Sequence, residues 1–181
     1  ALSLLSAGDT LYIGPATYRE QLADNDFTAG SGEGSETKII GDPDSNIFTG
    51  EVPGPVRITA KDVNEKSVQI SQIITCYKNH LHFHKLYIEG PGATGLSTSG
   101  NASAYFNSNI NSYTNSDVGN QIWFDCTMAG GYYGLRGRGT TYFNPVAVRC
   151  LFTSTGAWTL YANTINCIGI GARSGFYYGN H

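Results

Sequence analysis

A short pattern of apolar and polar positions recurs five times between residues 79 and 178. In each copy an apolar residue is followed by a polar one, then by a small or thiol residue and by mostly apolar positions. The copies are Phe83-His84-Lys85-Leu86-Tyr87, Phe106-Asn107-Ser108-Asn109-Ile110, Phe124-Asp125-Cys126-Thr127-Met128, Val148-Arg149-Cys150-Leu151-Phe152 and Ile165-Asn166-Cys167-Ile168-Gly169. Their first residues lie 23, 18, 24 and 17 positions apart. A period near 20 residues indicates a solenoid of stacked repeats.

A second short run follows four of the five copies after a Gly-rich corner. These runs are Gly95-Leu96, Gly134-Leu135, Trp158-Thr159-Leu160 and Gly175-Phe176-Tyr177. Each repeat therefore carries at least two short strands, with too little chain between them for a crossover helix. The pattern predicts an all-β fold, a right-handed single-stranded parallel β-helix of about seven or eight coils. In-register stacking would place equivalent residues about 4.8 Å apart, in columns along the tube.

Two core columns are predicted from the aligned copies. The first column contains Phe83, Phe106, Phe124, Val148 and Ile165, and the second contains Cys126, Cys150 and Cys167. We expect the thiols to be free and buried, packing as small hydrophobic groups. Ser108 and Lys85 occupy the thiol position in the two earlier copies. Lys85 does not fit this position, so either the register differs there or its stem lies along the wall with the amine outside.

Length and composition favour one domain over residues 1–181, with N-terminal coils and long loops over 1–75 and regular coils over 76–181. Charged residues make up only 14% of the chain, whereas Gly (23) and Tyr (12) are abundant, which is typical of extended β-solenoids. The net charge of −3 gives no reason to expect a nucleic-acid partner. No apolar run is long enough for a membrane span. The apolar start and the uncapped end lead us to expect a fragment of a longer chain.

The stretch Gly8-Asp9-Thr10-Leu11-Tyr12-Ile13-Gly14-Pro15-Ala16-Thr17-Tyr18-Arg19-Glu20 resembles the N-terminal coil of the pectin-lyase-like right-handed β-helix superfamily. Thr37-Lys38-Ile39-Ile40-Gly41-Asp42 resembles its second coil. Ala16 stands where that superfamily usually has Gly. The superfamily includes polysaccharide lyases and hydrolases, pectin methylesterases, and phage tailspikes and related virion proteins. The resemblance implies the fold far better than an activity.

Two clusters contain the residue types that bind metal ions. Asp24, Asp26, Glu33 and Glu36 lie in a Gly-rich loop, and clustered carboxylates can bind calcium, but they lack EF-hand spacing and a solvated loop is favoured. Strand alternation places His80, His82 and His84 on one face, opposite Leu81 and Phe83. Side chains in a flat row point in parallel and do not converge on one ion, so solvated histidines are favoured. No metal and no cofactor are predicted.

A carbohydrate-binding face is the strongest candidate site. Tyr rings stack on sugars, and guanidinium groups donate paired hydrogen bonds to acidic groups. The candidates are Tyr132, Tyr133, Arg136, Arg138, Arg149, Arg173 and Tyr177. The alternative is an ordinary exposed corner, since Tyr and Arg are also common interface residues.

Catalytic residues are not predicted. Beyond Glu89 the only carboxylates are Asp117 and Asp125, eight residues apart in one repeat. The sequence favours a non-catalytic structural or receptor-binding module of a virion spike, tail fibre or similar surface appendage, located outside the cell or on a virion. The resemblance implies a homotrimer, with polysaccharide or other surface proteins as further partners. The alternatives are a secreted pectin-lyase-like lyase or hydrolase that uses Asp125 with Arg149 and Arg173, and a bacterial surface adhesin.

Overall fold

The structure is a computed structural model of the whole chain. It describes residues 2–59, 61–64, 73, 74, 76, 78–90, 107, 108, 121–130, 133–137, 145–153, 157–160, 162–170 and 174–177. Helix in these residues is confined to two short 3-10 segments, η1 (Leu2–Leu4) and η2 (Asp24–Asp26). The prediction of an all-β protein is therefore confirmed.

The strands form three parallel sheets, which we name A, B and C. Sheet A contains, in hydrogen-bonded order, β1 (Thr10–Ile13), β3 (Thr37–Gly41), β5 (Leu81–His84), β8 (Gln121–Phe124), β11 (Val146–Val148) and β14 (Asn163–Ile165). Sheet B contains β2 (Ala16–Tyr18), β4 (Val56–Thr59), β6 (Tyr87–Glu89), β9 (Thr127–Ala129), β12 (Leu151–Thr153) and β15 (Ile168–Ile170). Sheet C contains β7 (Asn107–Ser108), β10 (Tyr133–Gly137), β13 (Ala157–Leu160) and β16 (Ser174–Tyr177).

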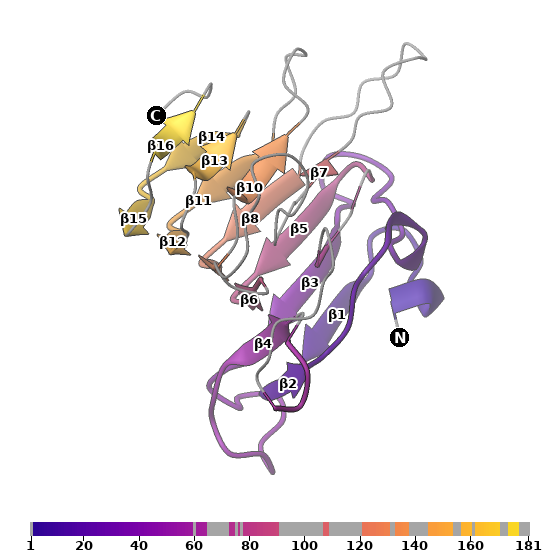
Figure 1. Cartoon of the computed structure of the whole chain (residues 1–181). Helices are drawn as coiled ribbons and strands as arrows, with labels where there is room; N and C mark the ends of the chain where they lie inside the picture. The colour runs from indigo at the N-terminus through magenta and orange to yellow at the C-terminus, as the bar shows by residue number, and fades with distance from the viewer. Residues whose placement is uncertain are drawn as a thin grey trace.

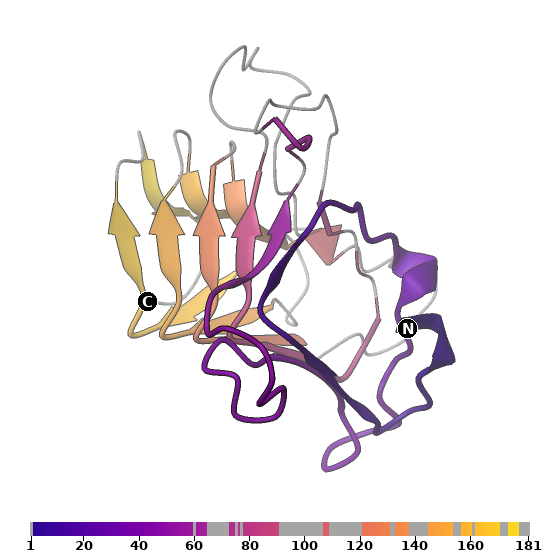
Figure 2. The same ribbon diagram turned by 90° about the horizontal axis from the view of Figure 1, so that it is seen from below.

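From β8 onward the chain visits the three sheets in turn, adding one strand to A, then B, then C. Figures 1 and 2 show the strands of each sheet side by side in sequence order, from indigo to yellow. Three of the predicted second runs lie in sheet C, where Leu135 pairs with Thr159 and Thr159 with Phe176. This arrangement is compatible with a parallel β-solenoid. We call one passage through the sheets a repeat.

Residues that alternate along each strand fill the space between the sheets. In β5 Leu81 and Phe83 are buried, whereas His82 and His84 are only partly buried. The Phe83 ring stacks on that of Trp123 with ring centroids 3.9 Å apart and an interplanar angle of 7°. The same inward column continues through Ala147, which pairs with Trp123 and is fully buried. Burial of these apolar surfaces is the main source of stability.

The first predicted core column is only partly right. Phe124, Val148 and Ile165 are aligned across neighbouring strands, but they face outward, and Ile165 is 51% exposed. Phe83 pairs with Trp123 and not with Phe124, so it belongs to the neighbouring inward column. A shift of one residue moves a side chain to the other face of a sheet, which accounts for the whole error. Phe106 lies outside the described residues.

A left-handed corner residue joins sheet A to sheet B in four repeats. Lys85, Asp125, Arg149 and Asn166 have φ values of 54°, 54°, 53° and 52°. Their amides connect successive repeats, since the N–H of Lys85 donates to the carbonyl of Phe124 at 3.0 Å and that of Arg149 to the carbonyl of Ile165 at 2.9 Å. Lys85 therefore corresponds to Asp125, which explains why it did not fit the thiol position. Leu86 takes that position instead.

The three cysteines of the predicted thiol column are free thiols one residue beyond the corner. Cys126 and Cys150 are buried and Cys167 is half-buried. The thiol of Cys126 and burial raise the pKa of Cys150 to about 12, and the Cys150 thiol together with burial also raises the pKa of Cys167. The raised pKa keeps Cys150 and Cys167 in the thiol form at neutral pH, in which they pack as small hydrophobic groups. Ser108 lies in sheet C opposite Gly137, so its assignment to this column is wrong.

Candidate functional site

The outward-facing residues of sheet A form a continuous surface across six strands, which we call the sheet-A wall. One of its columns contains Tyr12, Ile40, His84, Phe124, Val148 and Ile165. The other contains Thr10, Lys38, His82, Ile122, Val146 and Asn163. At about 4.8 Å per strand the wall is about 24 Å long.

Half of the sheet-A wall is aliphatic or Phe, although it faces away from the core. These residues are Ile40, Ile122, Phe124, Val146, Val148 and Ile165. The outer face of a solvated sheet is normally polar, because only one face packs on the core. A contiguous outward apolar surface is typical of a face that contacts another protein. The sequence contained this signal as apolar residues on both sides of the strands.

A polar and aromatic cluster borders the wall at the corner between sheets A and B. The Arg149 guanidinium carbon lies 4.4 Å from the centroid of the Phe124 ring, and the His84 ring centroid lies 5.5 Å from it. Arg149 Nε and Nη2 donate to the two carboxylate oxygens of Asp125 at 2.8 and 2.5 Å. This hydrogen bonding lowers the pKa of Asp125, so the carboxylate stays ionised. The cluster is a fixed ion pair beside an aromatic ring.

The predicted histidine row is confirmed for two residues. His82 and His84 both lie on the sheet-A wall with ring centroids 6.0 Å apart, and burial lowers the pKa of both imidazoles. His80 has φ of 52° and precedes β5, so strand alternation does not extend to it. Among the described residues no group of three or more His, Cys, Asp or Glu side chains is placed to hold a metal ion.

Three of the four predicted carboxylates of the loop 24–36, Asp24, Asp26 and Glu36, have separate protein partners. Asp24 pairs with Lys78 at 3.3 Å, Asp26 accepts the Ala23 N–H at 2.7 Å, and Glu36 accepts the Gly34 N–H at 2.8 Å. Two of these contacts fix turns of the loop itself. Asp26 and Glu36 therefore serve the local conformation of the loop, and Asp24 connects it to Lys78.

The predicted carbohydrate-binding residues lie on two sides of the repeats. Arg136 in β10 and Tyr177 in β16 share one row of sheet C, because each pairs with Leu160. Tyr133 lies three residues before Arg136 in β10. Arg149 lies instead at the corner between sheets A and B. The remaining candidates, Tyr132, Arg138 and Arg173, lie outside the described residues.

Sequence reasoning missed an ion-pair cluster on the outer face of sheet B. Glu89 accepts hydrogen bonds from Arg57 and from Lys61 Nζ, the latter at 2.6 Å. Its side chain is only 14% exposed. Arg57 and Glu89 are 32 residues apart and become neighbours only when β4 pairs with β6, so no local signal marked them.

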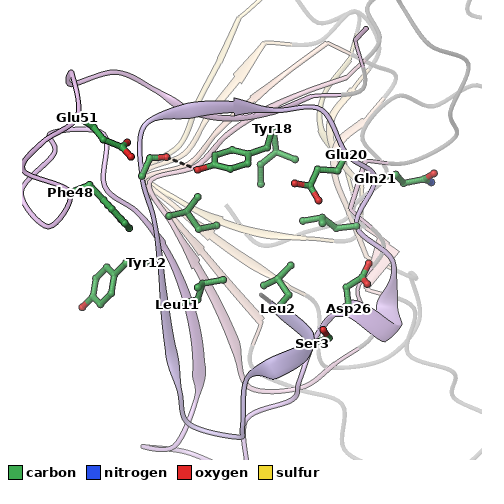
Figure 3. A pocket seen from close by; sticks show the side chains of 14 residues that line it. Leu2, Ser3, Leu11, Tyr12, Tyr18, Glu20, Gln21, Asp26, Phe48 and Glu51 are labelled. Carbon is green, nitrogen blue, oxygen red and sulfur yellow. Dashed lines mark hydrogen bonds between the residues drawn. The ribbon is translucent and has the colours of Figure 1, made fainter. Parts of the chain in front are cut away.

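A cavity of about 520 Å³ lies at the N-terminal end of the sheets (Figure 3). It is lined by Leu2, Ser3, Leu11, Tyr12, Ile13, Gly14, Tyr18, Glu20, Gln21, Leu22, Asp26, Phe48, Glu51 and Ile58. The Tyr18 hydroxyl donates to the Gly14 carbonyl at 3.1 Å, which holds the ring at the edge of the cavity. Burial raises the pKa of Tyr18, and the charges of Glu51 and Glu20 raise it further.

Comparison of the chain with protein-family models, curated proteins and solved structures found no match. Within the described part of the chain, no helix has the length and apolar character that a membrane crossing requires.

Proposed function

We propose that the chain is a right-handed parallel β-helix of the pectin-lyase-like type and a non-catalytic structural module of a virion spike, tail fibre or similar extracellular appendage. In this proposal the sheet-A wall packs against a second copy of the chain. The observation that supports it is the outward column in which Ile40, Phe124, Val148 and Ile165 extend along the stacked strands. The apolar surface is continuous from β8 to β14 in this column, and such a surface matches a partner that runs alongside, as parallel subunits of a fibre do.

The proposed assembly is a homotrimer with its three coil axes parallel. In a trimer one face of each subunit meets a different face of the next, and the ring closes after three contacts. The wall supplies the apolar face. Leu151, Ile168 and Ile170 on sheet B, of which the last two are 62% and 58% exposed, supply apolar surface on the adjoining side. Polysaccharide or other surface proteins would then meet the sides left outside the interface.

The carboxylates support a non-catalytic role. Glycoside hydrolysis needs a pair of carboxyl groups across the scissile bond. Among the described residues from β4 onward, Glu89 is held by Arg57 and Lys61, and Asp125 is held by Arg149. Asp62 accepts the Asn64 N–H in a turn at 2.8 Å. Glu89 pairs in register with Ala129, four residues beyond Asp125, so the two carboxylates lie at opposite ends of a corner and a strand.

A second candidate function, carbohydrate binding by sheet C, has one specific observation in its favour. Arg136 and Tyr177 occupy the same row two strands apart, which corresponds to about 10 Å between their backbones. That spacing is comparable to two sugar rings. The secreted lyase or hydrolase that uses Asp125 with Arg149 and Arg173, and the bacterial adhesin, stay as alternatives to the spike module.

Mass measurement in solution tests the proposed assembly. Sedimentation equilibrium of the wild-type chain should give three times the chain mass, and Val148→Glu should give the mass of one chain, because a charge in the wall cannot be desolvated. Val52→Glu is the matched control, since Val52 is 86% exposed in the segment between β3 and β4 and belongs to neither apolar face. A wild-type monomer at the highest soluble concentration, or equal effects of both variants, would contradict the proposal.

Activity assays separate the module from an enzyme. Incubation of the chain with acidic and neutral polysaccharides should leave their length distribution unchanged. Depolymerisation that Asp125→Asn abolishes would support the lyase or hydrolase alternative. Binding without cleavage, weakened by Arg136→Gln and left intact by Arg149→Gln, would support the carbohydrate-binding face on sheet C.

A further inference from the structure

Two of the free thiols, those of Cys150 and Cys167, occupy equivalent places in neighbouring repeats. The Cys150 thiol donates to the carbonyl of Trp123 at 3.3 Å, and the Cys167 thiol donates to that of Ala147 at 3.4 Å. Trp123 and Ala147 are partners in the register of sheet A, so the surroundings of one thiol are those of the other moved by one strand. The two sulfur atoms are therefore about 4.8 Å apart, which is the spacing of neighbouring strands.

Backbone hydrogen bonds on both sides of the two thiols hold the repeats at this spacing. The N–H of Arg149 donates to the carbonyl of Ile165 at 2.9 Å, and the N–H of Ile168 donates to the carbonyl of Cys150 at 2.9 Å. Between these two bonds the N–H of Cys150 donates to Cys167 Sγ at 3.4 Å. A donor aimed at a sulfur atom favours its negatively charged form. The backbone thus fixes both the separation of the pair and one contact that suits a thiolate.

The spacing of the pair is wide for a disulfide and suits a bridging ion. A disulfide brings the two Cβ atoms to about 3.8 Å, whereas equivalent Cβ atoms of stacked strands are about 4.8 Å apart. A metal ion in line between two thiolates, with metal–sulfur bonds of about 2.3 Å, spans about 4.6 Å. Cys150 and Cys167 therefore have the separation of two ligands on opposite sides of one ion.

The donor set selects a soft ion that accepts only two ligands. Thiolates prefer Cu(I), an ion that two thiolates can hold in a line. A structural zinc ion would need four ligands, and among the described residues no third His, Cys, Asp or Glu is placed to complete a metal site with the pair. The carbonyl oxygens of Trp123 and Ala147 direct their negative ends at the two sulfur atoms, which adds to the attraction of a cation.

Access and proton balance favour this pair of thiols. Cys167 is half-buried, whereas Cys126, the next thiol of the column, is 1% exposed, so an ion reaches Cys167 more readily. Both Cys150 and Cys167 are protonated at neutral pH, because a neighbouring thiol and burial raise the pKa of each. Binding of Cu(I) forms two copper–sulfur bonds and breaks two S–H bonds, and both protons pass to water. No electron is transferred.

We propose that Cys150 and Cys167 bind one Cu(I) ion between them, with the two sulfur atoms in line on either side of it. Cys150 belongs to the core cluster and Cys167 packs against it, and neither residue belongs to the sheet-A wall. The site is therefore independent of the proposed lateral association. The bound ion joins two neighbouring repeats, so it should also raise the urea midpoint of the chain.

Transfer of Cu(I) from the coloured chelator bicinchoninate to the full chain, in the absence of oxygen, tests the proposal. The wild-type chain should take up one ion and release two protons. X-ray absorption of the loaded chain should show two sulfur neighbours about 2.3 Å from copper. No uptake, or a copper ion with a single sulfur neighbour, would overturn the proposal. Zn(II) binding of equal affinity would also overturn it, because two thiolates do not satisfy zinc.

Serine variants locate the site. Cys150→Ser and Cys167→Ser should each weaken Cu(I) affinity by at least about a hundredfold, because a hydroxyl is a poor ligand for a soft ion. Cys126→Ser is the matched control in the same column, and Cys76→Ser is a control outside it. Both controls should leave uptake unchanged, and a loss in either that equals the loss in Cys167→Ser would overturn the assignment. Circular dichroism checks the fold of each variant, and the sulfur count of the loaded wild type decides the proposal even where a variant does not fold.

Discussion

The region from η1 to β4 and the repeats from β8 to β15 maintain their conformations in different ways. In the repeats, the backbone N–H of a corner residue donates to the carbonyl of the last sheet-A residue in the next repeat. The N–H of Asp125 donates to Val148 in this way, and that of Arg149 donates to Ile165. In the N-terminal region, long segments between strands are fixed by single side chains. The Asp42 carboxylate accepts the N–H groups of Asn46, Ile47 and Phe48 at 3.0, 2.7 and 3.0 Å.

The repeats therefore draw their stability from contacts spread over many residues, whereas the N-terminal loops draw theirs from a few side chains. A stacked column shares its packing over several repeats, so one surface substitution changes little. A loop that depends on one carboxylate loses its order when that group changes. The cavity lies in the N-terminal region, where the end of the column leaves apolar residues of β1 facing open space. The wall, in contrast, is a product of repetition.

The largest expected effect tests which aromatic residue belongs to the core of the repeats. Trp123→Ala should lower the free energy of unfolding by about 4 kcal/mol, because the buried ring stacks on Phe83. Phe124→Ala, one residue later and half-buried on the wall, should lower it by about 1 kcal/mol. Urea denaturation at several chain concentrations separates any contribution from association. A larger loss for Phe124→Ala would contradict the register.

The next effect tests the junction of the two regions. A Cβ on Gly41 would lie 2.4 Å from the backbone carbonyl oxygen of Lys85, and backbone atoms cannot move aside as a side chain can. Gly41→Ala should therefore destabilise the chain by about 3 kcal/mol. Gly50→Ala is the matched control, since a Cβ there meets no heavy atom within 4 Å. Thermal unfolding followed by circular dichroism measures both, and equal midpoints would contradict the close approach.

Sequence reasoning predicted the strand positions best where the pattern was local. Alternation in Leu81–His84 and the second runs of sheet C were visible in short windows, and so was the thiol position. The register between β5 and β8 could not be predicted in this way. Phe83 and Phe124 are the same residue type and were aligned, but the corner residues Lys85 and Asp125 are the positions that correspond in the structure. Lys has little preference for left-handed backbone, so nothing marked it as a corner.

The candidate surfaces were harder to predict because they depend on distant parts of the chain. Arg57 meets Glu89, and Arg149 meets Asp125, only through pairing of strands from different repeats. The cavity requires Leu2, Tyr18 and Glu51 to surround one end of the sheets. The predicted carbohydrate-binding residues were chosen by residue type, and the structure places them apart. Arg136 lies in sheet C, and Arg149 lies at the corner between sheets A and B.

A smaller effect is expected when the Asp42 carboxylate, which accepts three backbone N–H groups in the N-terminal region, is replaced. Burial raises the pKa of Asp42, but the three N–H donors from Phe48, Ile47 and Asn46 outweigh it and lower the pKa overall. Asp42→Asn removes one of the two accepting oxygens and places an NH₂ group against donors. Amide hydrogen exchange at Asn46, Ile47 and Phe48 should accelerate by about tenfold, with the amides of β11 unchanged. Unchanged exchange in the loop would show that other contacts hold it.

Two histidines make the repeats weakly dependent on pH. Burial lowers the pKa of His82 and His84 in the folded chain, so the unfolded chain takes up protons first. The stability they allow is complete above the unfolded pKa of about 6.5 and falls as pH decreases through that value toward the folded pKa. Urea midpoints between pH 7.5 and 5.5 should decline slightly, and His82→Gln with His84→Gln should flatten the decline. Asp42→Asn should keep it, since the N–H groups of Phe48, Ile47 and Asn46 lower the pKa of that carboxyl and place its titration at more acidic pH.

The smallest expected effect concerns the backbone of the corners. Lys85 and Asn166 have the same left-handed conformation, with φ of 54° and 52°, yet Asn adopts it more readily because its short polar side chain bonds locally. Lys85→Asn should therefore stabilise the chain by about 0.5 kcal/mol, and Asn166→Lys should destabilise it by a similar amount. Urea denaturation of the two variants and of their double exchange measures the difference. The double variant should have the wild-type urea midpoint, because the corners of different repeats have the same backbone conformation and the two changes should cancel. A midpoint far from that of the wild type would mean that the Lys85 amine has a role that repetition does not explain.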